Sequence, residues 1–450
     1  MVERAVEPEH PVASRAFAVA GVILVTVALS TFASGGASRM FRTIPFDQTI
    51  NMVAAQRLVD RDPLYDADAS RAQAVERAGH SMDGTYTVPT NGFPGLPSTA
   101  LVHVPFLLGS DEAGYTAFRW ASLLSMFGAV VLVARTLPRG ARLAGGLFGS
   151  GALLASNAVL ETIGYGQGHG FVMFGFALAI WGIATDRWKA VGIGLGWAAA
   201  LKLTPALIVV YLAVRGRKQV LGWAAGTVAA LAAAAAVVGR PQDLWTWATE
   251  VAPSLSGGAY QILNQSVPAV VARVASTSAD FDGAQGIGAW RHLAVAILAI
   301  GAVSLWRIRR HRPIDPLEVG VLLVLGLVAG PLTWDHYASW AALPLVLFAD
   351  PRRWAGRSRV EAGVVGSALG IAVLLMTLVV APPSVASVRA DGLLRWTSSP
   401  IALALVLLLG ASYRLVADPP HQTVGADTDA DADAEALVTG SEAGAALVGG

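Results

Sequence analysis

Long apolar runs and short polar segments alternate along almost the whole chain. The first run, residues 16–34, is almost entirely apolar and is long enough to cross a bilayer core of about 30 Å. The later apolar runs are 97–109, 114–134, 143–160, 169–185, 190–201, 206–214, 219–239, 287–306, 317–332, 338–349, 361–381 and 398–415. Because a backbone in lipid must satisfy its own hydrogen bonds, these runs predict helices. We therefore expect an all-α polytopic membrane protein with about 11–13 membrane-embedded helices.

The composition agrees with a membrane protein and excludes several kinds of chemistry. Of the 450 residues, 54% are hydrophobic and 14% are charged, whereas soluble domains carry about 25% charged residues. The chain has no cysteine, which excludes disulfides, thiolate metal sites and cysteine nucleophiles. The sequence indicates no nucleic-acid partner.

The two ends of the chain differ from its apolar part. Residues 1–15 form an acidic head that contains prolines, and we expect it to lie in the cytoplasm. The apolar run behind it exceeds the usual signal-peptide core and has no clear A-x-A cleavage site, so we interpret it as a retained span. Residues 417–450 are acidic and of low complexity, which predicts a disordered cytoplasmic tail. Residues 16–416 then form one membrane domain.

Basic loops indicate how the chain is threaded through the membrane. Five short loops carry the clusters Arg135/Arg139/Arg142, Arg187/Lys189, Arg215/Arg217/Lys218, Arg307/Arg309/Arg310/Arg312 and Arg352/Arg353/Arg357/Arg359. Positive residues mark cytoplasmic loops, and all five loops lie on one side only if two runs do not cross as ordinary spans. We predict that 97–109 is a short helix at the outer interface and that 190–214 is a hairpin turning at 202–205. A single helix kinked at Pro205 is the alternative for 190–214.

This threading places both termini in the cytoplasm and several polar segments on the outer side. The first outer loop, 35–113, contains Asp47 shortly after the first span. It also contains an amphipathic run, 50–59, which we expect to lie in the membrane interface. The prolines of 88–97 preclude a continuous helix, and Asn91 in that stretch is a candidate substrate contact. We interpret Asp47 as the centre of an active site at the membrane–water boundary; an exposed juxtamembrane carboxylate is the alternative.

Polar residues inside apolar runs are costly, so each is a candidate functional residue. Lys202 would cost about 2.5–3.5 kcal/mol in a span, and its compact cation suits a phosphate group. It could instead reach the interface or pair with a structural carboxylate. Gln167 lies in the glycine-rich segment 164–170, where glycines allow a ligand to approach the backbone and the amide suits sugar hydroxyls. The alternative is a turn at a helix end with a solvated glutamine.

Two further outer segments carry candidate binding residues. Asn264 in the long outer loop could bind sugar hydroxyls as Gln167 does. In the segment 331–337, His336 could donate to a phosphate or sugar oxygen, Trp334 could stack on a ring or a lipid chain, and Asp335 is a further candidate for substrate contact. Aromatic residues that anchor two helices at the interface are the alternative. Paired spacing such as H-E-x-x-H is absent, so we expect no metal.

The sequence contains no motif for binding a soluble nucleotide. A P-loop, a G-x-S-x-G element and a dinucleotide-binding glycine motif in a strand–helix setting are all missing. An enzyme that acts from the outer side would therefore need an activated donor that is already in the lipid. We expect no cofactor.

Together these features resemble a known family. Asp47 after the first span, the amphipathic run and the turn Asp62–Tyr65 are similar to the polyprenol-phosphate-sugar-dependent glycosyltransferases of family 87 in actinobacteria. The resemblance covers roughly 15–415 and continues, in the order typical of the family, through Gly166–Gln167, Lys202-x-x-Pro205, Asn264–Ser266 and Pro331-x-x-Trp334-x-His336.

The resemblance implies the GT-C fold in the plasma membrane. It also implies inverting transfer of a hexosyl residue, mannosyl first among the candidates, from a polyprenyl phosphate to an envelope glycolipid or glycan. Asp47 would be the general base. Lys202 and His336 would stabilise charge on the phosphate of the departing lipid. Gln167 and Asn264 would orient sugar hydroxyls.

The sequence departs from the family pattern at two places. The first loop has Val88–Asn91 where members often carry an aromatic-Pro-Pro element, and Asp335 has no place in the family's motif. A secondary transporter or lipid flippase is the alternative function, since discontinuous helices mark transport sites. Transporters usually show paired broken segments, however, and only 190–214 stands out here. A non-catalytic scaffold that binds envelope lipids is a second alternative.

Overall fold

The computed structural model describes residues 11–36, 46–78, 92–255, 263–275, 288–377 and 399–417. Within these ranges the regular elements are helices, and the only β-type pairings are two isolated antiparallel bridges, Ser156 with Thr377 and Asn264 with Trp334.

The α-helices are α1 (Pro11–Thr31), α3 (Phe46–Asp60), α4 (Ala67–Ala78), α5 (Pro97–His103), α6 (Asp111–Ala134), α7 (Arg139–Ala155), α8 (Asn157–Gly164), α9 (His169–Ala184), α10 (Trp188–Leu201), α11 (Ala206–Val214), α12 (Lys218–Val238), α13 (Pro241–Thr246), α14 (Ala252–Leu255), α15 (Val267–Ala275), α16 (Arg291–Arg309), α17 (Pro316–Ala329), α18 (Ala342–Phe348), α19 (Arg359–Met376) and α21 (Pro400–Ala417). Short 3₁₀ or π turns are η1 (Phe32–Gly36), η2 (Val104–Leu107), η3 (Trp247–Val251), η4 (Gly288–Trp290), η5 (Asp335–Ala341) and η6 (Pro351–Arg353).

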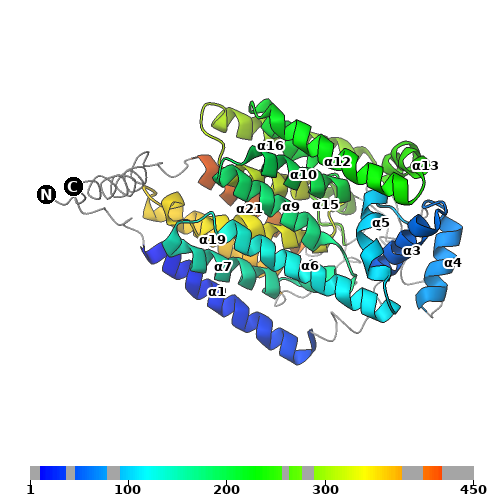
Figure 1. Ribbon diagram of the computed structural model, residues 1–450. Coiled ribbons are helices and arrows are strands. Elements are labelled where there is room, and N and C mark those ends of the chain that lie inside the picture. Colours follow the sequence, from blue (N-terminus) through cyan, green and yellow to red (C-terminus); the bar gives the residue numbers. More distant parts are fainter. Residues whose placement is uncertain are drawn as a thin grey trace, which may run out of the picture.

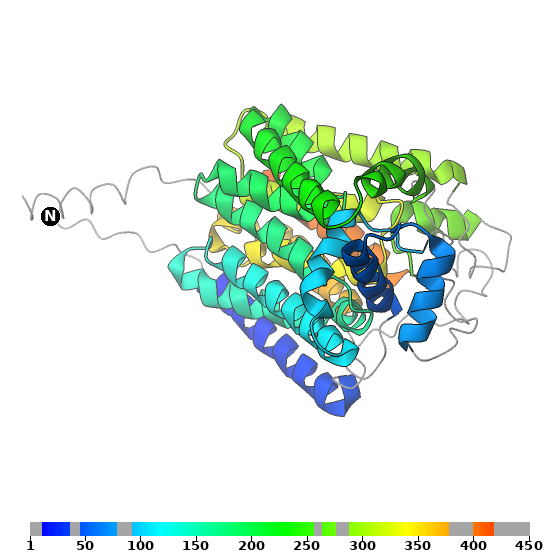
Figure 2. The same ribbon diagram turned by 45° about the vertical axis from the view of Figure 1, so that its right-hand side comes forward.

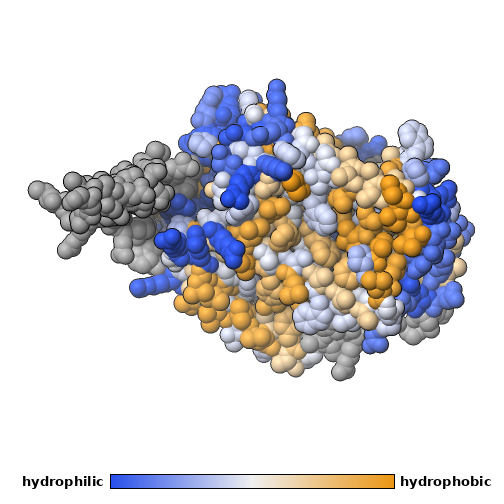
Figure 3. Space-filling view, in the orientation of Figure 1, coloured by the Kyte–Doolittle hydropathy of each residue, from blue (hydrophilic) through white to orange (hydrophobic). Residues whose placement is uncertain are grey.

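Six of the described helices are long and apolar enough to cross a membrane. They are Ala13–Gly35, Asp111–Ala134, Lys218–Val238, Gly288–Arg309, Arg359–Met376 and Pro400–Ala417. The helices α9 and α17 are apolar but shorter. Hydrophobic side chains form a band across the middle of the molecular surface, and hydrophilic side chains gather at its two ends (Figure 3). The expected all-α polytopic membrane protein is confirmed.

The basic loops lie together at one end of the bundle, which we call the arginine end. Arg215 follows α11 and donates from Nη2 to the carbonyl of Arg312, at 2.7 Å. Phe17, near the start of α1, has its ring centroid 5.9 Å from that of Trp354 in the last of these loops. The helices α3, α4, α5 and α13 gather at the opposite end (Figures 1 and 2). The bundle therefore has one arginine-rich end and one end covered by short helices.

The helices α10 and α11 form a hairpin within residues 190–214, as predicted. The helix α10 ends at Leu201 and α11 begins at Ala206. The guanidinium of Arg217, just beyond α11, lies 4.1 Å from the ring centroid of Trp188, the first residue of α10. A single kinked helix would hold these two residues roughly 40 Å apart at 1.5 Å per residue, so that alternative is wrong. The hairpin carries Lys202 away from the arginine end.

The first loop packs against protein more closely than its sequence predicts. The short helices α5 and η2 occupy residues 97–107, and neither is long enough to span a membrane, as expected. In α3, however, Met52 and Ala55 are fully covered, because α4, α5 and α12 pack around this helix. The apolar face of the run 50–59 therefore packs on protein, and its position at the membrane interface stays a prediction.

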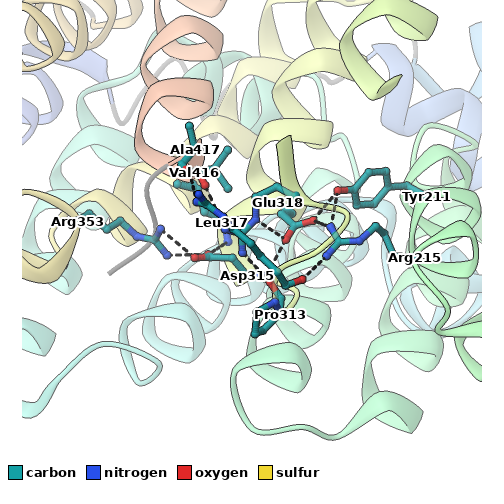
Figure 4. A network of polar contacts seen from close by, with 11 residues as sticks. Tyr211, Arg215, Pro313, Asp315, Leu317, Glu318, Arg353, Val416 and Ala417 are labelled. Carbon is teal, nitrogen blue, oxygen red and sulfur yellow. Dashed lines mark hydrogen bonds and ion pairs between the residues drawn. The ribbon is translucent and has the colours of Figure 1, made fainter. Parts of the chain in front are cut away.

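A buried carboxylate joins three helices at the arginine end (Figure 4). Glu318, in the first turn of α17, has a fully buried side chain that forms ion pairs with Arg215 and with Arg309 of α16, the latter at 3.1 Å. The hydroxyl of Tyr211 in α11 donates to the same carboxylate at 2.5 Å. Each carboxylate oxygen therefore accepts from an arginine, which compensates for the burial of the charge.

A second buried ion pair lies beside the first (Figure 4). Asp315 caps α17 by accepting from the backbone NH of Leu317 at 2.7 Å, and its carboxylate lies 2.8 Å from Nη2 of Arg353 in η6. The basic loops that indicate membrane threading in the sequence thus also hold α11, α16, α17 and η6 together.

Candidate active site

Asp47 and Gln167 meet at the end of the bundle opposite the arginine loops. Asp47 is the second residue of α3, a position where the helix dipole favours a negative charge. Gln167 donates from Nε2 to Oδ2 of Asp47 at 2.6 Å. The start of α3 is fixed to the turn after α8, because Gln48 donates its backbone NH to the carbonyl of Tyr165 at 3.1 Å. Two segments far apart in the sequence thus bring the predicted acid and amide into contact.

Gly166 makes this contact possible. Its φ is +66°, in the region that favours glycine. A Cβ at this position would lie 2.3 Å from Cβ and from Oε1 of Gln48. Any other residue would therefore push α3 away from the turn and separate Asp47 from Gln167. This requirement explains one glycine of the segment 164–170.

Lys202 lies at the break between α10 and α11. Its backbone is extended (φ −150°, ψ 129°) and ends α10, and its ammonium donates to the hydroxyl of Tyr337 at 2.7 Å. Among the described residues it forms no ion pair, so a structural carboxylate partner, one alternative from the sequence, is not found. The ammonium of Lys202 is thus positioned by a hydroxyl, which leaves it available to contact an anion.

His336 and Asp335 lie in η5, between α17 and α18. Both are nearly covered, with 5% and 4% exposure. Asp335 accepts the backbone NH of His336 at 2.8 Å, and its Oδ1 lies 3.4 Å from Nδ1 of His336. Neither ring nitrogen of His336 has a hydrogen-bond partner within the described part of the chain. Burial, followed by the charge of Lys202, lowers the pKa of His336 to about 4, while Asp47 and Glu161 oppose that shift.

Burial and three neighbouring residues shift the pKa of the Asp47 carboxyl in opposite directions. Burial raises the pKa of the Asp47 carboxyl, whereas His336, the hydrogen bond from Gln167 and the charge of Lys202 each lower it. The structure therefore brings four of the predicted residues, Asp47, Gln167, Lys202 and His336, within electrostatic reach of one another. One acid that can take a proton beside two groups that can bind an anion is suited to transfer with an anionic leaving group.

Asn264 has a structural position beside the site. Its Nδ2 donates to the carbonyl of Pro331 at 2.7 Å, and its Oδ1 accepts from the backbone NH of Thr333 at 3.0 Å and of Ser266 at 3.2 Å. These contacts tie the segment that carries Asn264 to the segment that carries His336. Trp334 is half-buried and packs against the main core. Asn91 lies outside the described residues.

Two polar residues near His336 were missed in the sequence. Glu161 lies in α8, close enough to raise the pKa of His336, and His169 is fully buried with its ring centroid 4.8 Å from that of His336. The signal for Glu161 was a carboxylate directly after the apolar run 143–160 and six positions before Gln167. Within the described ranges, no three His, Asp or Glu side chains lie together as metal ligands.

The chain is a polytopic helical bundle that brings a carboxylate, a lysine and a histidine together at one end. Residues 97–334 match the model of glycosyltransferase family 87, and the chain belongs to this family. The protein is therefore a multi-pass membrane glycosyltransferase. The resemblance seen in the sequence is confirmed, and the family favours an enzyme over a transporter or a scaffold.

Two named proteins are similar to the chain over more than half of its length, and a third over about a third of it. The polyprenol-phosphate-mannose-dependent alpha-(1-2)-phosphatidylinositol pentamannoside mannosyltransferase of Mycobacterium tuberculosis (strain CDC 1551 / Oshkosh) is 27% identical over 385 residues, 78% of this chain and 82% of that protein. The protein of the same name from Mycolicibacterium smegmatis is 26% identical over 290 residues, 62% of this chain and 66% of that protein. A polyprenol-phosphate-mannose-dependent alpha-(1-2)-phosphatidylinositol mannoside mannosyltransferase of Mycobacterium tuberculosis is 29% identical over 171 residues, 37% of this chain.

Proposed function

We propose that this glycosyltransferase transfers a mannosyl residue from polyprenyl-phosphate mannose to a glycolipid of the cell envelope, of the phosphatidylinositol mannoside class. The names of the relatives support both the donor and the acceptor class. The observation that carries the proposal is the contact of Asp47 with Gln167 at 2.6 Å, within electrostatic reach of Lys202 and His336.

The proposed reaction is a single inverting displacement. Asp47 removes the proton of an acceptor hydroxyl, and the oxygen attacks the anomeric carbon of the donor sugar. The bond from that carbon to the phosphate oxygen breaks, and polyprenyl phosphate leaves with the electron pair. Lys202 and His336 stabilise the charge that grows on the phosphate. Since the oxygen of the acceptor displaces the phosphate directly, one carboxylate is sufficient and no glycosyl-enzyme forms.

The remaining predicted residues surround this reaction. Gln167 orients Asp47 and a sugar hydroxyl, while Trp334 and Asp335 contact the substrates and Asn264 holds their loop. Asn91 is proposed as a contact from the first loop. The positive-inside rule supports a cytoplasmic arginine end, with both termini on that side. The active site then faces the extracytoplasmic side of the plasma membrane. No cofactor or metal is part of the proposed reaction.

Transfer in sealed vesicles tests both the reaction and its sidedness. Right-side-out vesicles that contain the protein are supplied from outside with a short-chain polyprenyl-phosphate [14C]mannose and a phosphatidylinositol mannoside. We expect labelled glycolipid in these vesicles and little in inverted ones. Transfer only in inverted vesicles would contradict the sidedness. Labelled glycolipid in neither, with transfer by a related mannosyltransferase as positive control, would contradict the donor or the acceptor class.

The hydrogen bond from Gln167 predicts a shift in the pH dependence of transfer. This bond lowers the pKa of Asp47, so Gln167→Met should raise it. Because the base must be ionised, transfer falls as the pH drops through this pKa, and the acidic limb of kcat/KM should move to higher pH. The exposed pair Gln56–Asp60 on the same helix, 2.8 Å apart, supplies the control Gln56→Met, which should leave the limb in place. An unmoved limb in Gln167→Met would contradict this assignment.

A further inference from the structure

Glu161 is an acid that the proposed reaction does not use. It lies in α8, which leads from α7 to the turn that carries Gln167, and α8 packs along η5. Its Oε1 accepts from Nδ2 of Asn157 at 3.3 Å, and the same carboxyl accepts a hydrogen bond from the hydroxyl of Tyr165. Its Oε2 is buried and has no hydrogen-bond partner among the described residues.

The surroundings of Glu161 differ from those of the structural acids. The buried carboxylates Glu318 and Asp315 are each held by arginine in ion pairs of the arginine end. Within the described part of the chain, Glu161 forms no such pair. Burial raises the pKa of the Glu161 carboxyl most, and the nearby Asp335 raises it further, whereas His336 lowers it. Because Glu161 forms no ion pair there, its carboxyl does not stabilise the fold in the way that Glu318 and Asp315 do. We take this difference as an indication that Glu161 binds a ligand.

Buried polar atoms without a partner converge at this place. Among the described residues they are Oε2 of Glu161 and Nε2 of His336, on segments joined by the bond from Oγ1 of Thr162 to the carbonyl of His336 at 3.3 Å. Buried polar groups in folded proteins are nearly always hydrogen-bonded, so two such atoms on neighbouring segments mark a position that a polar ligand completes. A carboxyl oxygen accepts hydrogen bonds, and the groups of the proposed substrates that donate them are sugar hydroxyls.

We propose that Glu161 binds the 2-hydroxyl of the sugar that is transferred, an inference that rests on the proposed function. The choice of hydroxyl follows from the position of His336. His336 is a neighbour of Glu161 and, in the proposed reaction, also contacts the leaving phosphate. That phosphate is attached to the anomeric carbon, so the hydroxyl on the adjacent carbon lies nearest to both groups. In glycosyl transfer, hydrogen bonds to this hydroxyl strengthen in the transition state, and Glu161 therefore favours sugars that carry it.

Deoxy donors test this contact. Transfer by wild type, Glu161→Leu and Glu161→Gln is compared for polyprenyl-phosphate mannose and its 2-deoxy and 6-deoxy analogues. With the mannosyl and 6-deoxy donors, Glu161→Leu should lower kcat/KM by roughly 10- to 100-fold, and Glu161→Gln by less because its amide oxygen still accepts. With the 2-deoxy donor, each variant should retain the wild-type rate within about threefold.

Two controls keep the outcomes distinct. Glu112→Gln makes the same chemical change on the exposed first turn of α6 and should match wild type with every donor. Thermal unfolding shows whether each Glu161 variant folds, and Glu161→Gln carries the test if Glu161→Leu does not. An equal loss with all three donors would overturn the contact while leaving the proposed function intact. A wild type that uses no mannosyl donor would overturn the proposed function and this inference with it.

Discussion

Asp47→Asn is expected to abolish sugar transfer while the donor still binds. Asparagine has the same shape but cannot take the acceptor's proton at neutral pH, and general bases contribute about 10²–10⁴-fold to rates. A loss of roughly a thousandfold in kcat is therefore expected. The measurement is transfer from radiolabelled polyprenyl-phosphate mannose in membranes with equal amounts of each protein, together with binding of the same donor.

The matched control for this change is Asp60→Asn at the other end of α3. Asp60 is exposed and pairs with Gln56, so its loss should leave transfer unchanged. Equal transfer by wild type and Asp47→Asn would contradict the assigned base. The next candidate would then be Asp335, whose burial raises its pKa to about 6.

Glu318→Gln is expected to produce the largest loss of stability. The side chains of Glu318, Arg215 and Arg309 are almost completely buried, and removal of the negative charge leaves two buried cations with a neutral partner. Breaking a buried ion pair in this way costs about 3–5 kcal/mol. We expect a clearly lower temperature of unfolding in detergent and less folded protein in the membrane.

Glu361→Gln is the control for this loss. Glu361 also binds two arginines, Arg357 and Arg414, but its side chain is 25% exposed, and water can replace the lost interaction. Its unfolding temperature should stay close to that of wild type. If the two variants unfold at the same temperature, the buried network at the arginine end contributes no special stability.

Several elements of the fold were predictable because they follow from the cost of charge in lipid. The hairpin of 190–214 follows from the basic loops at both of its ends. Lys202 was identified because a lysine between apolar runs is costly in lipid. The position of α3 was not predictable. Its pattern of apolar residues is the same whether lipid or protein covers them, and only the positions of α4, α5 and α12 decide between the two.

The site was predictable where one residue stood out against its neighbours. Asp47, Gln167 and His336 interrupt apolar or glycine-rich segments, so each was visible alone, although their contacts depend on the turn at Gly166. Glu161 was missed because an acid at the end of an apolar run is the ordinary pattern of a helix end. The sequence also did not predict that arginines of the basic loops form buried ion pairs. Their partners Asp315 and Glu318 follow one basic loop directly but are distant in sequence from the loops of Arg215 and Arg353.

The bridge between the long outer loop and η5 has a consequence for how the enzyme could diversify. The backbone NH of Gln265 donates to the carbonyl of Thr333 at 2.7 Å, and the NH of Asp335 donates to the carbonyl of Leu263 at 3.0 Å. Because main-chain atoms make both bonds, neither depends on the identity of the side chains at Leu263, Gln265 or Asp335, and the side chain of Asn264 adds its own bonds to Pro331 and Thr333. Substitutions in this loop that preserve these bonds would therefore alter its surface while the backbone around His336 keeps its geometry.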